Sequence, residues 1–292
     1  MPEFQTPEPI TAVIDLTMGD LRIDAAERGE TVVEVRPRDA ASRADVRTAE
    51  QTQVEYAAGR LSIRTPRGWR SYSPFSGGGC VDVNVQLPAG SQVTADAAVA
   101  AIHGTGRLGD CRLKTAVGEI RLEQAESARL VTSAGNVSAG RVTGELEIST
   151  ASGEVRVDEV TGTVVVKSSN GDTRIHEVAG DLRVKAANGD IHVERAAGSV
   201  TVKTANGEIR LGSVARGSVA AETGFGAVEV GIADGSAAWM DLHTSFGHVR
   251  NGLDAAQSPQ PGEETVEVRA RTGFGDITIN RCRTAAAVEG GR

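Results

Sequence analysis

The sequence has 292 residues and a net charge of −8, and aromatic residues make up only 3% of it. So few aromatic side chains argue against a conventional globular core, because Phe, Tyr and Trp dominate burial in such cores. The negative balance argues against general binding to nucleic acids or anionic membranes, although it leaves room for a local basic stripe.

The start of the chain and its cysteines bear on its location. The first ten residues, MPEFQTPEPI, lack the basic and apolar segments of a secretory signal, and no apolar run approaches membrane-spanning length. Cys80, Cys111 and Cys282 are an odd number without CxxC spacing, which fits a reducing compartment. We therefore expect a cytoplasmic protein that does not insert into a membrane.

Residues 1–95 are predicted to form an N-terminal coil and an irregular cap. The coil is indicated by alternating apolar residues around one glycine: Ala12, Ile14, Gly19, Leu21 and Ile23. One short helix is expected near 42–52, where Gly and Pro are scarce, and one strand over 56–65. A Pro/Gly loop over 66–79 carries the aromatic residues Trp69, Tyr72 and Phe75. Such a cap would cover an open strand edge.

Residues 96–280 contain a glycine that returns at a nearly fixed interval of 18 residues. The series is Gly118, Gly135, Gly153, Gly171, Gly189, Gly207 and Gly226. With the glycine counted as position 0, positions −7, −5, +2, +4 and +7 are apolar and the residues between them are polar, which is the alternation of half-buried strands. A fixed period of this size indicates stacked repeats.

The predicted fold is therefore all-β, a parallel β-solenoid with coils of about 18 residues. Right-handed winding is the default for parallel crossovers. The alternative is an antiparallel meander, because the pairs Asn170-Gly171, Asn188-Gly189 and Asn206-Gly207 are strong hairpin signals. We rank it second, because hairpins need no constant period and a meander would leave its apolar face uncovered.

Two further coils are predicted around Gly247 and Gly275, with inserted loops at 231–239 and 251–265. Residues 281–292 are expected to form a disordered tail. Position −1 changes along the repeats, from Asn170, Asn188 and Asn206 to Phe225, Phe246 and Phe274. We expect the three Phe rings to fill a widened core, with an exposed aromatic strip as the alternative.

Motifs for catalysis or cofactor binding are weak. Residues 104–109 match GxGxxG, but they lead into a predicted strand and not into a helix that could hold a pyrophosphate. His176 and His192 could share an outer face, but no third ligand lies at metal-site spacing. Cys111 falls on the inward position −7 and is expected to be a core thiol. No catalytic, cofactor-binding or metal-binding residues are predicted.

The charged positions form columns. Position +1 is mostly acidic and position +3 mostly basic, which predicts lateral ion pairs on a solvated face. The four lysines of the chain all occupy position −4: Lys114, Lys167, Lys185 and Lys203. These four residues are the candidate stripe for an anionic partner, and the alternative is that they serve only solubility.

The repeat cores have the form TxxG[DE][IV], as in Thr150–Val155, Thr204–Ile209 and Thr272–Ile277. Together with Gly19-Asp20-Leu21-Arg22-Ile23, they resemble the bacterial "putative adhesin" β-strand-repeat family over nearly the whole chain. That resemblance implies a β-helical, non-enzymatic module, which in the family is sometimes attached to a membrane.

We expect a non-catalytic intracellular interaction or scaffold module that needs no cofactor and whose partner is a protein or an acidic polymer. The first alternative is an adhesin-like protein at the cell surface or envelope. The second is a polysaccharide-active β-helix enzyme, which would need large loops with clustered acids and bases. A monomer is favoured over an end-to-end filament, because the predicted ends are irregular.

Overall fold

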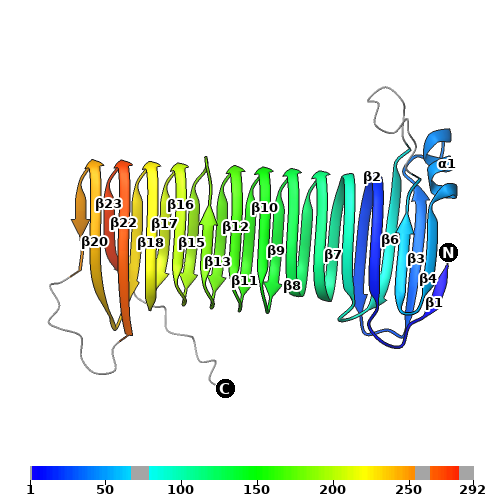
Figure 1. Ribbon diagram of the computed structural model, residues 1–292, viewed down its shortest axis with the longest axis horizontal. Coiled ribbons are helices and arrows are strands. Elements are labelled where there is room, and N and C mark those ends of the chain that lie inside the picture. The colour runs from blue at the N-terminus through cyan, green and yellow to red at the C-terminus, as the bar shows by residue number, and fades with distance from the viewer. Residues whose placement is uncertain (1, 67–78, 254–263, 283–292) are drawn as a thin grey trace, which may run out of the picture. The chain divides into compact units, whose positions relative to one another are not determined.

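The computed structural model describes residues 2–66, 79–253 and 264–282 (Figure 1). The chain divides into two compact units, Met1–Val160 and Thr161–Arg292, called unit 1 and unit 2 below. Trp69, Tyr72 and Phe75, the loop tip at 254–263 and the tail residues 283–292 lie outside the described residues. No helix in the described part of the chain combines the length and the apolar character that crossing a bilayer would require.

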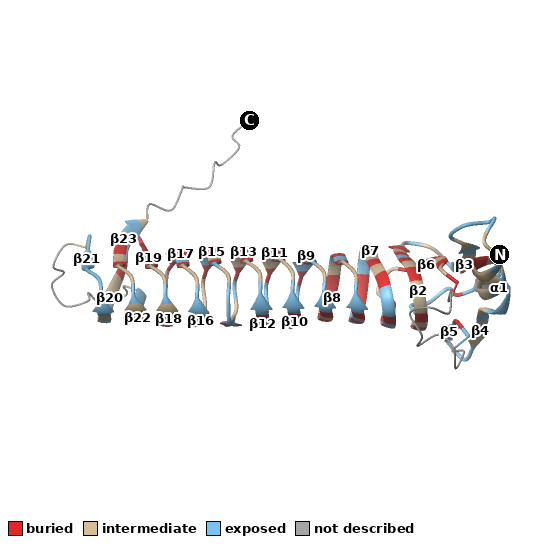
Figure 2. Cartoon of the chain, turned by 90° about the horizontal axis from the view of Figure 1, so that it is seen from above, coloured by how far each residue is buried: buried red, intermediate tan, exposed pale blue. Residues whose placement is uncertain are grey.

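Each coil of unit 2 consists of two strands with the repeat glycine at the corner between them. One strand of each coil belongs to the first sheet, which comprises β12 (Val164–Asn170), β14 (Leu182–Lys185), β16 (Val200–Asn206), β18 (Gly217–Phe225), β22 (Glu264–Phe274) and β20 (Ser236–Phe246). The other belongs to the second sheet, which comprises β13 (Thr173–Val178), β15 (Ile191–Ala196), β17 (Ile209–Val214), β19 (Val228–Ala233), β23 (Ile277–Cys282) and β21 (Val249–Asn251). Figure 2 shows the two rows of strands.

Strands of successive coils pair in parallel, which confirms the predicted solenoid. Leu182 lies beside Val200 and Val184 beside Val202, an offset of one 18-residue repeat. All four of these side chains are almost completely buried. The Asn-Gly bends join two strands that do not pair with each other, so the antiparallel meander is wrong. Each buried Val or Leu contributes about 1.5–3 kcal/mol of transfer free energy, and the columns supply this in every coil.

The corner glycines allow successive coils to approach each other closely. Gly189 has φ +126°, and a Cβ atom built on it would lie 2.3 Å from the carbonyl oxygen of Gly171 in the preceding coil. At Gly207 the same distance, to the oxygen of Gly189, is 2.1 Å. Only glycine adopts this positive φ readily and has no Cβ atom that would clash with the carbonyl oxygen. The 18-residue spacing therefore follows from a contact between backbones.

The threonine of the TxxG core contacts the same corner. Thr223 Oγ1 donates to the carbonyl oxygen of Gly207 at 3.0 Å, and Thr272 Oγ1 donates to that of Gly226 at 2.9 Å. The threonine is buried at position −3 and so reaches the glycine carbonyl of the neighbouring coil. Because a buried hydroxyl needs a partner, this bond explains the Thr at position −3 in these two coils, whereas Thr204 donates to Asn206 in its own coil and Thr150 has no partner among the described residues.

The last coils of unit 2 do not stack in sequence order. β22 pairs with β18 on one side and with β20 on the other, and β23 likewise lies between β19 and β21. The coil 264–282 is therefore inserted between coils 217–233 and 236–251 (Figure 2). The predicted loop at 231–239 is wrong, because β19 and β20 are separated only by Asp234 and Gly235.

Unit 1 has the same coil plan and a different start. Its solenoid strands are β2 (Thr11–Ala26), β6 (Val81–Pro88), β7 (Gln92–Val117), β8 (Ile120–Ala134), β9 (Val137–Val142), β10 (Leu146–Ser152) and β11 (Val155–Val160). β2 lies between β6 and β7 and pairs in parallel with both. This confirms the coil predicted around Gly19, which stands beside Ala100.

The remaining elements of unit 1 extend this stack. They are β1 (Glu3–Gln5), β3 (Glu30–Pro37), α1 (Arg43–Gln51), β4 (Gln53–Ala57) and β5 (Arg60–Arg64). β3 pairs antiparallel with β6, and Ser42 caps the predicted short helix by accepting from the backbone amide of Asp45. The single strand expected over 56–65 is in fact part of a hairpin, because β4 and β5 turn at Ala58 and Gly59.

We expect Gly189→Ala to destabilise unit 2 by about 3 kcal/mol or more, because both the positive φ and the backbone clash must be relieved. The matched control is Gly235→Ala, where φ is +82° and no atom lies within 4 Å of the added Cβ. That substitution should lower the free energy of unfolding by only about 1 kcal/mol, because only the positive φ disfavours alanine there. Urea unfolding of the two variants measures the difference. Equal losses would contradict the proposed role of the close approach.

Candidate functional site

The three lysines of unit 2 form a continuous column on the outer face of the first sheet. Lys167 on β12 lies beside Lys185 on β14, which lies beside Lys203 on β16. Neighbouring strands in a sheet are about 4.8 Å apart, so the column offers one ammonium group at each such step. All three residues are exposed to solvent. The structure thus brings together three of the four residues of the predicted stripe.

Neutralisation along the column is uneven. Lys203 Nζ lies 2.5 Å from Glu222 Oε2, in the next coil of the first sheet. On β14, Arg183 and Lys185 are both exposed, and neither forms an ion pair with any residue that the structure describes. Sequence reasoning missed Arg183, although its spacing of two from Lys185 on a strand places both side chains on the same face. The centre of the column is therefore the most basic part.

Lys114 lies in unit 1 and has a different setting. Its neighbour in the next strand is Val131, and its Nζ lies 3.4 Å from Asp96 Oδ2 in the preceding coil. Within unit 1 it is a single base beside an acid and not part of a lysine column. The lysine face considered below therefore consists of Lys167, Arg183, Lys185 and Lys203.

A lane of small residues runs beside the lysine column. Position −2 of the first sheet, in the order of the stacked coils, carries Ser169, Ala187, Ala205, Gly224, Gly273 and Ser245. These side chains are too short to fill the space between the long lysines at −4 and the residues at −1. Beside Lys167, Lys185 and Lys203 the first sheet therefore presents a flat strip bordered by bases, and at the next coil this border carries Glu222.

The other border of the lane consists of Asn and then Phe. Asn188 Nδ2 donates to Asn170 Oδ1, and Asn206 Nδ2 donates to Asn188 Oδ1, both at 2.9 Å. The Phe rings continue the row in the stacked order 225, 274, 246, with ring centroids 4.9 and 4.7 Å apart and nearly parallel planes. Each of these amides bonds to its neighbour and each ring stacks on the next, so the row is stiff.

The expectation that the Phe rings fill the core is wrong. Phe225, Phe274 and Phe246 are 56%, 48% and 66% exposed. Position −1 lies at the corner beside the glycine, where no second sheet covers it, so the rings stack on one another outside the core. The alternative of an exposed aromatic strip describes the observed arrangement. The stacking order could not be predicted, because it depends on the inserted coil.

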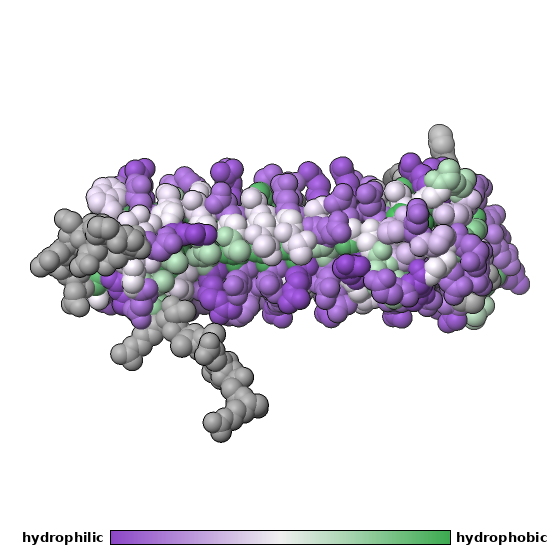
Figure 3. All heavy atoms as spheres, turned by 90° about the horizontal axis from the view of Figure 1, so that it is seen from below, coloured by the Kyte–Doolittle hydropathy of each residue, from purple (hydrophilic) through white to green (hydrophobic). Residues whose placement is uncertain are grey.

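The second sheet of unit 2 shows the predicted lateral ion pairs. Arg210 contacts Glu208 at 2.7 Å in its own coil and Glu229 at 3.0 Å in the next, and Arg195 contacts Glu177 at 2.6 Å. His176 Nδ1 lies 2.6 Å from Glu194 Oε2, so its partner is an acid and not His192. Hydrophilic side chains border the coils on both margins of the face drawn in Figure 3.

Acids at position +1 also bind the backbone of the next coil. Asp172 Oδ1 accepts from the amide of Asp190, and Asp190 Oδ1 accepts from the amide of Glu208, at 3.1 and 2.8 Å. Asp276 Oδ1 accepts in the same way from the amide of His248 at 2.9 Å. Sequence reasoning had assigned these acids only to side-chain pairs. The aspartates at position +1 thus link coils through the backbone, whereas Glu154 and Glu208 at this position bind Arg156 and Arg210.

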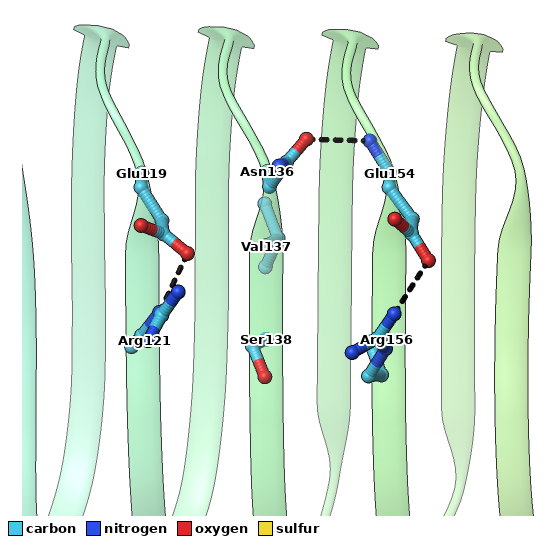
Figure 4. A pocket seen from close by; sticks show the side chains of 7 residues that line it. All are labelled: Glu119, Arg121, Asn136, Val137, Ser138, Glu154 and Arg156. Atoms are coloured by element: carbon cyan, nitrogen blue, oxygen red, sulfur yellow. Dashed lines mark hydrogen bonds and ion pairs between the residues drawn. The ribbon is translucent and has the colours of Figure 1, made fainter.

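Shallow hollows occur where a short side chain interrupts the arginine column. In unit 1, Ser138 lies between Arg121 and Arg156 (Figure 4). Each arginine is bound to the acid two residues before it, with Arg121 Nε 2.6 Å from Glu119 Oε1 and Arg156 Nη2 3.0 Å from Glu154 Oε1. The hollow is thus lined by ion pairs that already satisfy one another.

The other sequence candidates have structural roles. The GxGxxG segment lies inside β7 at a β-bulge between Gly104 and Arg107. Cys111 is buried as predicted, and burial raises the pKa of its thiol to about 12. Among the described residues no cluster of His, Cys, Asp and Glu has a metal-binding arrangement.

Comparison with known families now places the chain. The model of the Toastrack family, DUF4097, matches residues 13–280. This chain belongs to that family. The match covers the solenoid strands of both units, including the inserted coils, and confirms the resemblance drawn from the repeat cores. Comparison with curated proteins finds no match.

Several solved structures are similar to this chain. They include a "putative cell adhesion protein" from Clostridium sporogenes (13% identity, TM-score 0.26, covering 96% of this chain and 98% of that one). They also include a "putative adhesin" from Bacteroides fragilis (12%, 0.35, 95% of each chain) and one from Parabacteroides distasonis (13%, 0.35, 95% of each chain).

The link between Asp276 and His248 should depend on pH. The His248 amide, and then the charges of Arg250 and His248, lower the pKa of the Asp276 carboxyl. A depressed pKa in the folded state gives a stabilisation that is complete above the unfolded pKa of about 3.9 and is lost as pH falls through the folded value. Hydrogen-exchange protection of the His248 amide should therefore be constant at neutral pH and fall in strong acid.

The control for this measurement is Asp276→Asn, whose amide oxygen can still accept from His248 but does not titrate in this range. In this variant, hydrogen-exchange protection of the His248 amide should show no pH dependence that arises from residue 276. If the wild-type chain and the variant show the same acid dependence, Asp276 is not the titrating group.

Proposed function

We propose that this protein is a non-catalytic interaction module that holds an extended acidic chain along the lysine face of unit 2. The single observation that carries this proposal is the register of Lys167, Lys185 and Lys203 on three successive strands. A linear polyanion laid across the strands would meet one ammonium group at about every 4.8 Å. Weak contacts that repeat along one ligand add up in the way of multivalent binding.

The charge balance around the column supports an anionic ligand. Like charges on neighbouring strands destabilise a sheet, and two ammonium groups about 5 Å apart repel by roughly 1 kcal/mol even in water. A bound polyanion would relieve this repulsion. Arg183 adds a fourth base beside Lys185, and both lack an ion pair within the described residues. The small-residue lane leaves room for a backbone to lie beside the bases.

The non-catalytic part of the proposal is supported by the chemistry of the hollows. Catalytic acids and bases need neighbours that shift their pKa values toward neutrality and a place where a substrate displaces water. The carboxylates at these hollows are instead held by arginines, as at Glu119 and Arg121. Such paired, solvated side chains suit a scaffold.

We also propose that the protein acts inside the cell. Cys80, Cys111 and Cys282 are all free thiols. Burial is the main factor that raises the pKa of the Cys80 and Cys282 thiols, which keeps them in the less reactive protonated form. Unpaired thiols are typical of proteins from reducing compartments.

Replacing Lys167, Lys185 and Lys203 with Gln tests the binding proposal. Three exposed charges contribute about 0.5 kcal/mol each, so the triple variant should bind an acidic polymer about tenfold more weakly at low salt. Fluorescence anisotropy with labelled poly-L-glutamate and with labelled polygalacturonate measures this and separates a polypeptide from a polysaccharide. The thermal midpoint should be unchanged or raised, because repulsion within the column is removed.

The matched control removes three bases from the second sheet, with Arg174, Arg195 and Arg210 replaced by Gln. It lowers the net charge by the same amount, so the affinity should change less than twofold if the lysine face is the site. If both variants bound the polymer equally weakly, the loss of affinity would follow from net charge alone, and the proposal would be overturned. Shortening of polygalacturonate by the wild-type chain would overturn its non-catalytic part.

A further inference from the structure

The terminal coil of unit 2 has an open edge. β20 pairs with β22 and β21 with β23, and within the described residues neither strand pairs on its other side. Figure 1 shows β20 as the outermost labelled strand of its sheet. A long unpaired edge is a template for another strand, and proteins normally protect such edges with charge, Pro or a covering segment. β20 has 11 residues and contains no Pro or Lys.

Apolar residues that are buried in inner coils are exposed in this one. Val249 occupies position +2 and is 45% exposed, whereas Val228 and Ile277 at the same position in neighbouring coils are fully buried. Met240 on β20 is likewise only partly buried, whereas Val219 at the same position −7 of an inner coil is fully buried. The end of the core is thus uncovered among the described residues, and covering it would stabilise the coil.

The free edge also carries backbone groups that point outward. In an inner coil, the amide of Leu182 at position −7 donates to Ser199 in the next coil, and the amide of Ala186 at −3 donates to Lys203. Met240 and Thr244 occupy positions −7 and −3 of the terminal coil. Their amides therefore point away from β22, toward the place where a further strand would lie.

We propose that the strand that covers this edge is β20 of a second copy of this chain, paired antiparallel about a two-fold axis. Such an axis, perpendicular to the sheets, would bring β20 against β20 and β21 against β21, so that both sheets continue through the interface. The contact is isologous. It pairs the open edge of each copy with that of the other, so assembly ends at a dimer. It therefore differs from the end-to-end filament that the sequence disfavoured.

The residues of β20 select one register for this pairing. Centred on Leu242, the axis places Leu242 against itself and Met240 against Thr244, so the residues with outward amides face one another. On the solvent face, Asp241 of each copy then lies opposite His243 of the other. Centred on Asp241, the axis would instead place two carboxylates directly opposite each other, which is destabilising. The Leu242 register avoids this repulsion and places an imidazole, which can donate a hydrogen bond, opposite each carboxylate, so it is favoured.

Sedimentation equilibrium of the wild-type chain over a range of concentrations tests the proposal, and we expect a reversible equilibrium between one and two chains. His243→Asp places acids opposite Asp241 at two symmetry-related positions. It should weaken dimerisation about tenfold, a change that corresponds to about 1.4 kcal/mol. Adding Asp241→Lys to that variant restores opposite charges and should restore the dimer. Both side chains lie on the outer face, but Asp241 lies opposite Arg269 and 3.6 Å from Arg271 on β22, so the thermal midpoint of the double variant is measured beside its mass.

A second variant tests the axis itself. Leu242→Lys places two like charges against each other at the two-fold axis and should give a monomer, whereas the size-conserving Leu242→Met should still dimerise. Circular dichroism verifies that each variant keeps its strands. A wild-type mass of one chain at all concentrations, as expected if residues 254–263 or 283–292 cover the edge, would overturn the proposal. So would a dimer that both charge variants leave intact, or assemblies larger than two.

Discussion

The contact between corner glycines determines how closely the coils of each unit can stack. At Gly189 and Gly207 the carbonyl oxygen of the preceding corner occupies the space that a Cβ atom would need. The Gly207 oxygen occupies the same space at Gly226 and also accepts from Thr223, so this close approach positions a buried hydroxyl as well. The apolar columns and the sheet registers can form only if these corners remain superimposed from one coil to the next.

Each residue type of the TxxG[DE][IV] core can thus have a separate structural role. In the core Thr272–Ile277 the threonine bonds to the Gly226 carbonyl, Gly275 permits the close approach, Asp276 accepts from the His248 amide, and Ile277 enters the core. The outward positions −4, −2 and +3 take no part in this and are free to carry different chemistry. The lysine column at Lys167, Lys185 and Lys203 uses that freedom.

The sequence was sufficient to predict the coil period, the parallel register and the lysine column, because all three follow from residues repeating at one interval. The sequence was insufficient where a property depended on the spatial order of the coils or on whether another segment covers a side chain. The Phe rings at 225, 246 and 274 were assigned to the core because an apolar residue at a repeat position usually faces inward. Their exposure depends on the shape of the corner, and their order on the inserted coil 264–282, neither of which leaves a periodic signal.

The insertion of the last coil has a consequence for how unit 2 is assembled. Residues 236–251 have no strand partner in coil 217–233 and pair instead with residues 264–282, which come later in the chain. Until that later segment is in place, the outermost coil has nothing to pair with. The C-terminal end of the solenoid is therefore completed by an interlocking step, and the final segment, held on both sides, cannot peel away from the chain terminus one strand at a time.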